Sequence, residues 1–337
     1  MTSQTTFKSQ NGISKLCVIG LITLSIMSGT SANSYFLNDG FNTYLMSLTT
    51  DYYTYFETNQ GFQEYLRYWN DFVGFMNKYE RTYSSRSELW YRYHNFVNNM
   101  ERIEEVNSGN YSYRLGITPF VDHSFAEFSS KYLGYRTPST GPSRNVPVHT
   151  YTQQDLEHLP SAVDWRAEGW VTNIKNQEQC GSCWAFSTVA SMEGQHANVT
   201  GNLTSLSEQN LVDCASQCYG CNGGWMYFAM EYVVQNGGID TEASYPYTGM
   251  DGTCSYNASN SGAKFSSYVN VTKGDGAGLL HAVGTVGPIS VAIDAENDMM
   301  MYKSGIFTST ECDTESLDHG VAVVGYGESH TGVPFYI

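Results

Sequence analysis

The sequence predicts an α+β protein whose helices and strands fall in different parts of the chain. Residues 183–236 carry apolar side chains at helical spacing. From about Phe265 onward the chain favours short β segments, at 290–294, 305–307, 320–326 and 335–337. This division predicts an α-rich lobe and a β-rich lobe with a cleft between them, where binding sites commonly form. The length of 337 residues allows two or three structural units.

Residues 1–32 have the pattern of a secretory signal peptide. Lys8 and Lys15 precede an apolar run over 16–27, and small residues at 30–32 offer a cleavage site. This apolar run is too short to span a bilayer. An uncleaved signal anchor is the alternative, and only in that case do we expect attachment to a membrane. Cys17 lies in this segment and is left out of the disulfide count.

The next part of the chain, residues 33–107, begins with a stretch for which we predict no function and continues with a helical pattern. Residues 33–65 are rich in Tyr, Asn and Thr and have no period, whereas 65–107 have a helical pattern. Six positions, spaced 4, 4, 3, 4 and 4 residues apart, fall within an arc of roughly 100° on one helix. They are Glu88, Arg92, Phe96, Asn99, Ile103 and Asn107. Residues 136–150, which contain three prolines, predict an exposed linker that a protease could cut.

The stretch from Gln177 to Phe186 is where we expect the chemistry. The apolar spacing after Cys183 predicts a helix, with this cysteine at its N-terminus. Free N–H groups and the helix dipole favour the thiolate there, which is the nucleophilic form. Gln177 offers a side-chain amide that could stabilise an oxyanion. Residue types alone leave three alternatives open: a redox pair of Cys180 and Cys183, a zinc site that adds Cys218 and Cys221, and a structural disulfide.

The charge of the chain is strongly acidic and uneven. The formal net charge is −16, of which residues 1–157 carry −2 (12 basic, 14 acidic) and residues 158–337 carry −14 (5 basic, 19 acidic). Such a surface repels nucleic acid and anionic membranes, so neither is an expected partner. Entry to the secretory route would make glycosylation possible, and five Asn-x-Ser/Thr triplets are present. We favour Asn198 and Asn202, which we expect in one polar loop; the others are Asn110, Asn257 and Asn270.

Several short motifs resemble one known family. Cys180-Gly181-Ser182-Cys183-Trp184 matches the cysteine signature of papain and the cathepsins. Four further stretches are similar to the same family, closest to its cathepsin L branch: 163–166, 206–209, 221–224 and 318–321. The six-position helix pattern and Gly116-x-Thr118-x-Phe120-x-Asp122 resemble the propeptides of that branch, with Thr118 in place of the usual Asn. The likeness runs from about Trp69 to the last residue.

The resemblance implies a papain-like fold of an α-rich lobe and a β-barrel-like lobe, preceded by a helical inhibitory prosegment. It implies Cys183 as nucleophile, His319 as general base and acid, and Gln177 as oxyanion donor. His196 and His281 lack such context, and we expect them at the surface. The implied domains are a signal segment at 1–32, a propeptide at 33–157 with its inhibitory part at about 65–135, and a peptidase domain at 158–337. No cofactor or metal is expected.

The family also implies positions that contact substrate. Gly223 and Gly224 match the backbone edge that pairs with an extended peptide. Gly181 matches the adjacent site, and Asp318 is placed among the substrate-contacting positions. The residues that match the pocket for the second residue before the cut are Trp225, Met226, Ala292, Leu317 and Gly320.

The cysteines are assigned from the same resemblance. It implies the pairs Cys180–Cys221 and Cys214–Cys254. The odd number of cysteines in the expected mature part suggests one free thiol, which would be the nucleophile. Cys218 has no usual counterpart, and the usual partner of Cys312 would follow Ile337, so a Cys218–Cys312 bridge is an open alternative.

The sequence departs from the family's pattern at one point. The family's Asn-Ser-Trp motif, whose Asn orients the histidine, has no counterpart, so we expect that the sequence stops before that segment. The sequence therefore predicts a cysteine endopeptidase made as an inactive precursor, with a weak or inactive homologue as the alternative. Its partners would be protein and peptide substrates and its own propeptide. Its location would be an acidic, lysosome- or vacuole-like compartment or the extracellular space.

Overall fold

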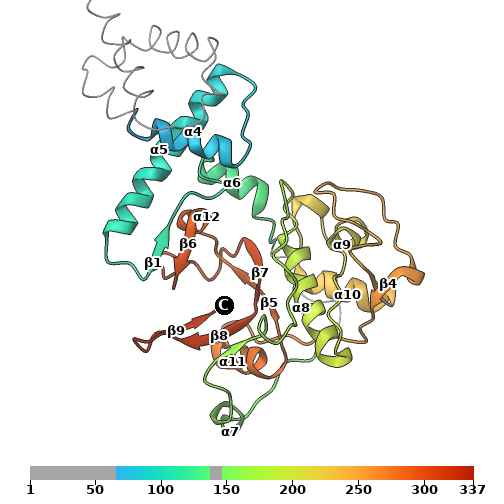
Figure 1. The fold of residues 1–337 in the computed structure, drawn as a ribbon. Helices are drawn as coiled ribbons and strands as arrows, with labels where there is room; N and C mark the ends of the chain where they lie inside the picture. The colour runs from blue at the N-terminus through green and yellow to red at the C-terminus, as the bar shows by residue number, and fades with distance from the viewer. Residues whose placement is uncertain (1–65, 137–145) are drawn as a thin grey trace, which may run out of the picture. The chain divides into compact units, whose positions relative to one another are not determined.

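The computed structural model describes residues 66–136 and 146–337, shown in Figure 1. The expected signal segment, residues 33–65 and the middle of the linker, 137–145, lie outside the described residues. The described chain begins with a short 3-10 helix, Leu66–Tyr68, and helix α4, Trp69–Lys78.

The helical pattern expected over 65–107 is divided between two α-helices. After α4 ends, Glu80 adopts a left-handed backbone conformation with φ of 52°, which does not continue a right-handed helix. Helix α5, Arg86–Ser108, then begins because Ser85 caps it by accepting from the N–H of Glu88. The carboxylate of Glu88 in turn accepts from the N–H of Ser84 at 2.9 Å.

The six-position pattern lies on α5 and organises the turn that follows. Phe96 and Ile103 are buried. Asn99 donates to the carbonyl groups of Val121 and His123 at 2.8 and 2.9 Å, and Arg92 forms an ion pair with Glu127. Glu127 belongs to helix α6, Phe125–Tyr132, which begins with a capping box formed with Ser124. The pattern therefore joins α5 to α6 through both its apolar and its polar members.

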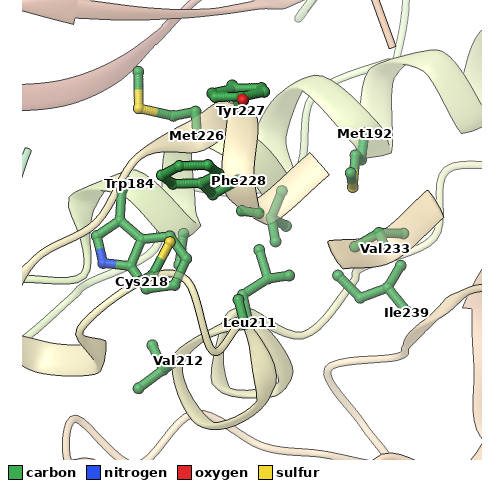
Figure 2. Packing of buried hydrophobic residues seen from close by; sticks show 14 of the residues in the cluster. Trp184, Met192, Leu211, Val212, Cys218, Met226, Tyr227, Phe228, Val233 and Ile239 are labelled. Atoms are coloured by element: carbon green, nitrogen blue, oxygen red, sulfur yellow. The ribbon is translucent and has the colours of Figure 1, made fainter. Parts of the chain in front are cut away.

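The α-rich lobe contains α8 (Cys183–Thr200), α9 (Glu208–Cys214) and α10 (Met226–Asn236). Two short 3-10 helices, Gly220–Asn222 and Ala258–Asn260, and the paired strands β3 (Ile239–Asp240) and β4 (Ser261–Ala263) complete it. Trp184, Leu211, Phe228 and Ile239 pack in its core (Figure 2). Burying each such side chain contributes about 1.5–3 kcal/mol.

The β-rich lobe is built from small antiparallel sheets. Strand β5 (Ile289–Ile293) pairs with β7 (His319–Val323), and β8 (Gly325–Glu328) lies between β2 (Val163–Asp164) and β9 (Pro334–Tyr336). Helix α11 (Gly276–Thr285) packs on β8, and the short α12 (Asn297–Met300) precedes β6 (Tyr302–Gly305). The run expected as one strand over 320–326 is broken at Val324, and the strand expected at 305–307 ends at Gly305.

Residues that precede the two lobes in the sequence contact the β-rich lobe at several points. Strand β1, Tyr113–Leu115, pairs antiparallel with β6. Arg102 forms a two-pronged ion pair with Asp298, at 2.9 and 2.8 Å, and the hydroxyl of Tyr113 donates to the same carboxylate at 2.8 Å. A short helix, α7 (Gln153–Glu157), packs near α11.

One predicted modification site lies in a different element from the one expected. Asn198 belongs to the last turn of α8, because this helix continues to Thr200 and ends at Gly201, whose φ is 73°. Asn202 follows in the loop, and both side chains are exposed. Among residues 66–136 and 146–337, no helix combines the length and the apolar character that a membrane span requires.

Candidate active site

Cys183 is the first residue of α8, as the apolar spacing predicted. Its sulfur accepts from the backbone N–H of Gly134 at 3.3 Å and from that of Gly320 at 3.4 Å. The thiol is buried, with 1% of the residue exposed. One donor comes from the segment after α6 and the other from β7, so the thiol lies where three parts of the chain meet.

His319 is the first residue of β7 and pairs with Ile293 of β5. Helix α8 packs on both strands, and the N–H of Gly320, the residue after His319, reaches the sulfur of Cys183. Gly320 permits this approach, because a Cβ there would lie 3.1 Å from the sulfur of Met226 and 3.3 Å from the carbonyl group of Cys183. Within the described chain, Nδ1 of His319 is buried and has no hydrogen-bond partner.

Burial keeps both groups neutral in this state. Burial raises the pKa of the Cys183 thiol, although the N–H groups of Gly320, Gly134 and Trp184 act in the opposite direction. Burial also lowers the pKa of His319 to about 4. The expectation that the helix N-terminus favours a thiolate is therefore not met in the covered site, because loss of solvent outweighs the N–H donors.

Gln177 lies in the loop that precedes α8, and both N–H groups of its side-chain amide already donate hydrogen bonds. Its Nε2 donates to the carbonyl group of Cys180 at 2.8 Å and to that of Tyr132 at 2.9 Å. The first bond orients the amide within its own loop. The second bond uses the remaining N–H of the amide to contact Tyr132, the last residue of α6. An oxyanion could therefore accept from this N–H only after Tyr132 has moved away.

Residues 134–136 run along the positions that were expected to contact substrate. Gly224 donates to the carbonyl group of Gly134 at 2.8 Å and accepts from the N–H of Arg136 at 3.1 Å. Tyr135 donates to the carbonyl group of Asp318 at 2.9 Å. A Cβ on Gly134 would overlap the carbonyl group of Gly181, so only glycine permits this close approach.

The residues that were expected to form an apolar pocket pack in one cluster with a residue of this segment. Met226 is buried, and Trp225, Ala292 and Leu317 pack as half-buried side chains against the same cluster. Tyr135 joins the cluster, with its ring edge-on to Trp225 at 6.4 Å between centroids. Sequence reasoning had missed Tyr135, whose only local signal is a Gly-Tyr pair just after a helix.

Seven cysteines lie within the described residues: four form two disulfides, and three are free thiols. The disulfides are Cys180–Cys221 and Cys214–Cys254, and the free thiols are Cys183, Cys218 and Cys312. The bridge considered between Cys218 and Cys312 is absent, because the first thiol is buried in the α-rich core and the second is exposed. The odd number of cysteines suggested one free thiol, whereas the described residues contain three.

A buried charge cluster connects α8 to α9 through Lys175. Lys175 contacts Glu193 at 2.8 Å and Glu208 at 2.7 Å, and each glutamate side chain is 1% exposed. Burial raises the pKa of Glu208 to about 8, so near neutral pH this carboxyl holds a proton for much of the time and Lys175–Glu193 is the ion pair. Glu208 belongs to the family-like stretch at 206–209, whereas nothing local in the sequence pointed to Lys175.

His281 is not the isolated surface residue that was expected. Its Nδ1 lies 2.7 Å from Nε2 of His149, and Tyr151 stacks on its ring. His149 belongs to the segment before the peptidase lobes and His281 to α11, so their pairing depends on tertiary structure. His196 lies in α8 and is half-buried.

Comparison with known proteins shows the class to which this fold and site belong. The family model described as papain family cysteine protease matches residues 159–337, and the cathepsin propeptide inhibitor domain (I29) matches residues 72–128. The chain belongs to the papain family of cysteine proteases. It is a cysteine proteinase precursor that carries its own inhibitory propeptide domain.

Individual relatives are similar over most of their length. Cysteine proteinase 5 of Dictyostelium discoideum is 44% identical over 80% of this chain and 76% of its own. Cathepsin L of Sarcophaga peregrina is 40% identical over 77% and 80%. Among solved structures, recombinant stem bromelain precursor has a TM-score of 0.74 and 37% identity over 80% of this chain and 85% of its own.

Proposed function

We propose that Cys183 is the nucleophile, His319 the general base and acid, and Gln177 an oxyanion donor. The observation that carries this proposal is the shared contact at the thiol: Gly320, next to His319, donates to the sulfur at the start of α8. Once solvent reaches the site, His319 would take the proton of Cys183. The thiolate would attack the substrate carbonyl, and imidazolium would protonate the leaving amine as the thioester forms. Water would then release the acyl group.

The proposed propeptide, residues 33–157, holds the peptidase domain at 158–337 in a latent state. Three contacts support this: Gly134 covers the thiol, Tyr132 occupies the amide of Gln177, and residues 134–136 pair with Gly224. An extended substrate would need the same backbone groups. Latency therefore follows from direct competition for the site.

Alkylation of the free thiols tests latency directly. In the intact precursor at neutral pH, iodoacetamide should label the exposed Cys312 and leave Cys183 unlabelled. After the propeptide is removed, Cys183 should label faster than Cys312, because a thiolate paired with imidazolium forms there. Cys218 is an internal control, since burial raises its pKa to about 11. Equal labelling of Cys183 and Cys312 before removal would contradict the proposal; peptide mass mapping distinguishes the sites.

Acid should trigger release, and the His149–His281 pair should respond before the carboxylates. Burial, and then His281, lower the pKa of His149 below 6.5, while Asp275 acts in the opposite direction. The docked state therefore binds fewer protons than the released state, so docking weakens as the pH falls below about 6.5. The pKa of Asp298 stays below 3.8, because Arg102 and Tyr113 outweigh its burial. Its contribution is lost only at still lower pH.

Replacing His149 with glutamine should lower the pH midpoint of propeptide release by about one unit, since one titrating partner is gone while a hydrogen-bonding side chain remains. Tyr151, Asp155 and Asp275 remain around His281 in this variant. His158→Gln is the matched control, because His158 lies at the start of the proposed peptidase domain and its ring bonds to the backbone carbonyl group of Gln154 instead of to a second histidine. Gel analysis across pH 4–7 measures release. Unchanged midpoints for both variants would rule out the histidine pair.

We also infer a preference for a bulky apolar residue two positions before the cut. The support is the cluster of Trp225, Met226, Ala292 and Leu317, to which Tyr135 adds a ring in the latent state. Burial of Leu rather than Arg there should raise kcat/KM by roughly 10- to 150-fold, from about 1.5–3 kcal/mol. Two peptides that differ only in Leu or Arg at this position measure the ratio of kcat/KM. The control is a second pair of peptides with the Leu-to-Arg exchange one residue farther from the cut. Faster cleavage of the Arg peptide would refute the pocket.

Proteases of this class are typically secreted or lysosomal. The acid response inferred for His149 favours an acidic, lysosome- or vacuole-like compartment for activation, with the extracellular space as the alternative. Asn198 and Asn202 are exposed and would be open to glycosylation on that route.

A further inference from the structure

One tyrosine hydroxyl connects the two ends of the loop that carries the proposed oxyanion donors. The hydroxyl of Tyr247 donates to the backbone carbonyl group of Gln177 at 2.8 Å. The same oxygen lies 2.7 Å from Oγ of Ser182, the residue before Cys183. Since a carbonyl group can only accept, the single Tyr247 proton goes to Gln177, and Ser182 must donate to the Tyr247 oxygen.

Ser182 occupies the N-cap position of α8 without acting as a side-chain cap. A serine at this position commonly accepts a bond from the first turn of its helix. Here no such bond is present, because the Ser182 hydroxyl is turned toward Tyr247. The Ser182 hydroxyl therefore ties Tyr247 to the start of α8 instead of capping the helix.

Tyr247 is itself held on two further sides. Its backbone N–H donates to Oε1 of Glu242 at 2.9 Å. Its ring lies edge-on to Phe186 at 4.9 Å between centroids, and Phe186 is in the first turn of α8 after Cys183. The hydroxyl thus has a defined position relative to both the loop and the helix.

We propose that Tyr247 is a positioning residue for the oxyanion-binding pair. The two donors are the side-chain amide of Gln177 and the backbone N–H of Cys183, and they must point at the same oxygen. Tyr247 sets their spacing by bonding to Gln177 at one end of the loop and to Ser182 at the other. Its role is confined to this spacing, since its hydroxyl is bound to the backbone carbonyl group of Gln177 and to the hydroxyl of Ser182. This inference rests on the roles proposed above for Cys183 and Gln177.

The test compares two tyrosines from the same turn in the full chain after acid activation. Tyr247→Phe should lower kcat about tenfold with KM within about twofold, which is less than the 10²–10³-fold expected for removal of an oxyanion donor itself. Tyr245→Phe is the matched control, because it loses a hydroxyl bonded to Asp213 at 2.8 Å but has no contact to the loop. Its kcat should stay within about twofold of wild type. Equal losses of kcat in the two variants would overturn the proposal.

A double-mutant cycle with Gln177→Ala separates positioning from general stability. If Tyr247 acts through the amide of Gln177, Tyr247→Phe should cost less than about threefold in the Gln177→Ala background. The affinity for a peptide aldehyde, measured by calorimetry, gives a second readout. The aldehyde is bound by addition of the thiol and by the oxyanion donors, without the later steps of turnover. This affinity should fall about tenfold in Tyr247→Phe. A full tenfold effect in both backgrounds would overturn the inference, whereas a wild-type chain that binds no aldehyde would refute the catalytic roles on which it rests.

Discussion

Replacing Cys183 with alanine should reduce peptide turnover on the order of 10⁶-fold, the scale seen when a covalent nucleophile is removed. The propeptide contacts use backbone groups of Gly134, Gly224 and Asp318, so the variant precursor should still fold and hold its propeptide. The measurement is hydrolysis of a fluorogenic peptide per mole of folded protein. A trace of wild-type enzyme can remove the propeptide in trans, with its own turnover subtracted as a blank.

Cys312→Ala is the matched control for this result. Cys312 is a free, exposed thiol, so its loss should leave turnover unchanged. If Cys183→Ala kept more than about one hundredth of wild-type turnover, another group would have to be the nucleophile. A loss of turnover in both variants would point to damage from cysteine removal in general.

Replacing Lys175 with methionine should lower the free energy of unfolding by about 3–5 kcal/mol, the usual cost of removing one partner from a buried ion pair. Without Lys175 the Glu193 carboxylate would stay buried, with 1% of its side chain exposed, and the neighbouring Glu208 carboxyl group, which holds a proton for much of the time, could not offset its charge. Leu206 would still donate to Glu193 at 2.9 Å, which limits the loss but does not replace the charge. Urea denaturation at pH 7 measures the free energy of unfolding of both chains. The Cys183→Ala background is used for both, which prevents self-digestion.

A surface ion pair of the same type provides the comparison. Lys273 contacts Glu315 at 2.9 Å, but the two side chains are 68% and 76% exposed. Lys273→Met should therefore cost less than about 1 kcal/mol. Similar losses for the two variants would show that burial does not decide the strength of the Lys175 cluster.

Local sequence determined where the helices begin and what chemistry they carry. The apolar spacing after Cys183 placed this cysteine at the first residue of α8, and the six-position pattern marked the buried face of α5. The short motifs were specific enough to indicate the family, because residues within a few positions of one another set helix starts and loop shapes. The helical pattern expected over 65–107 is divided between two α-helices, because the left-handed residue Glu80 lies between them.

Tertiary structure alone decided which distant groups meet. Tyr247 lies 70 residues from Gln177, and His149 lies 132 residues from His281, so no local pattern could report either contact. The protonation of Cys183 was also outside the reach of the sequence. A helix N-terminus favours a thiolate. The segment that contains Gly134 donates an N–H to the Cys183 sulfur, but the same segment also helps to exclude water from it. Burial then outweighs the donors, because the cost of losing solvent depends on everything packed around the group and not on its neighbours in the chain.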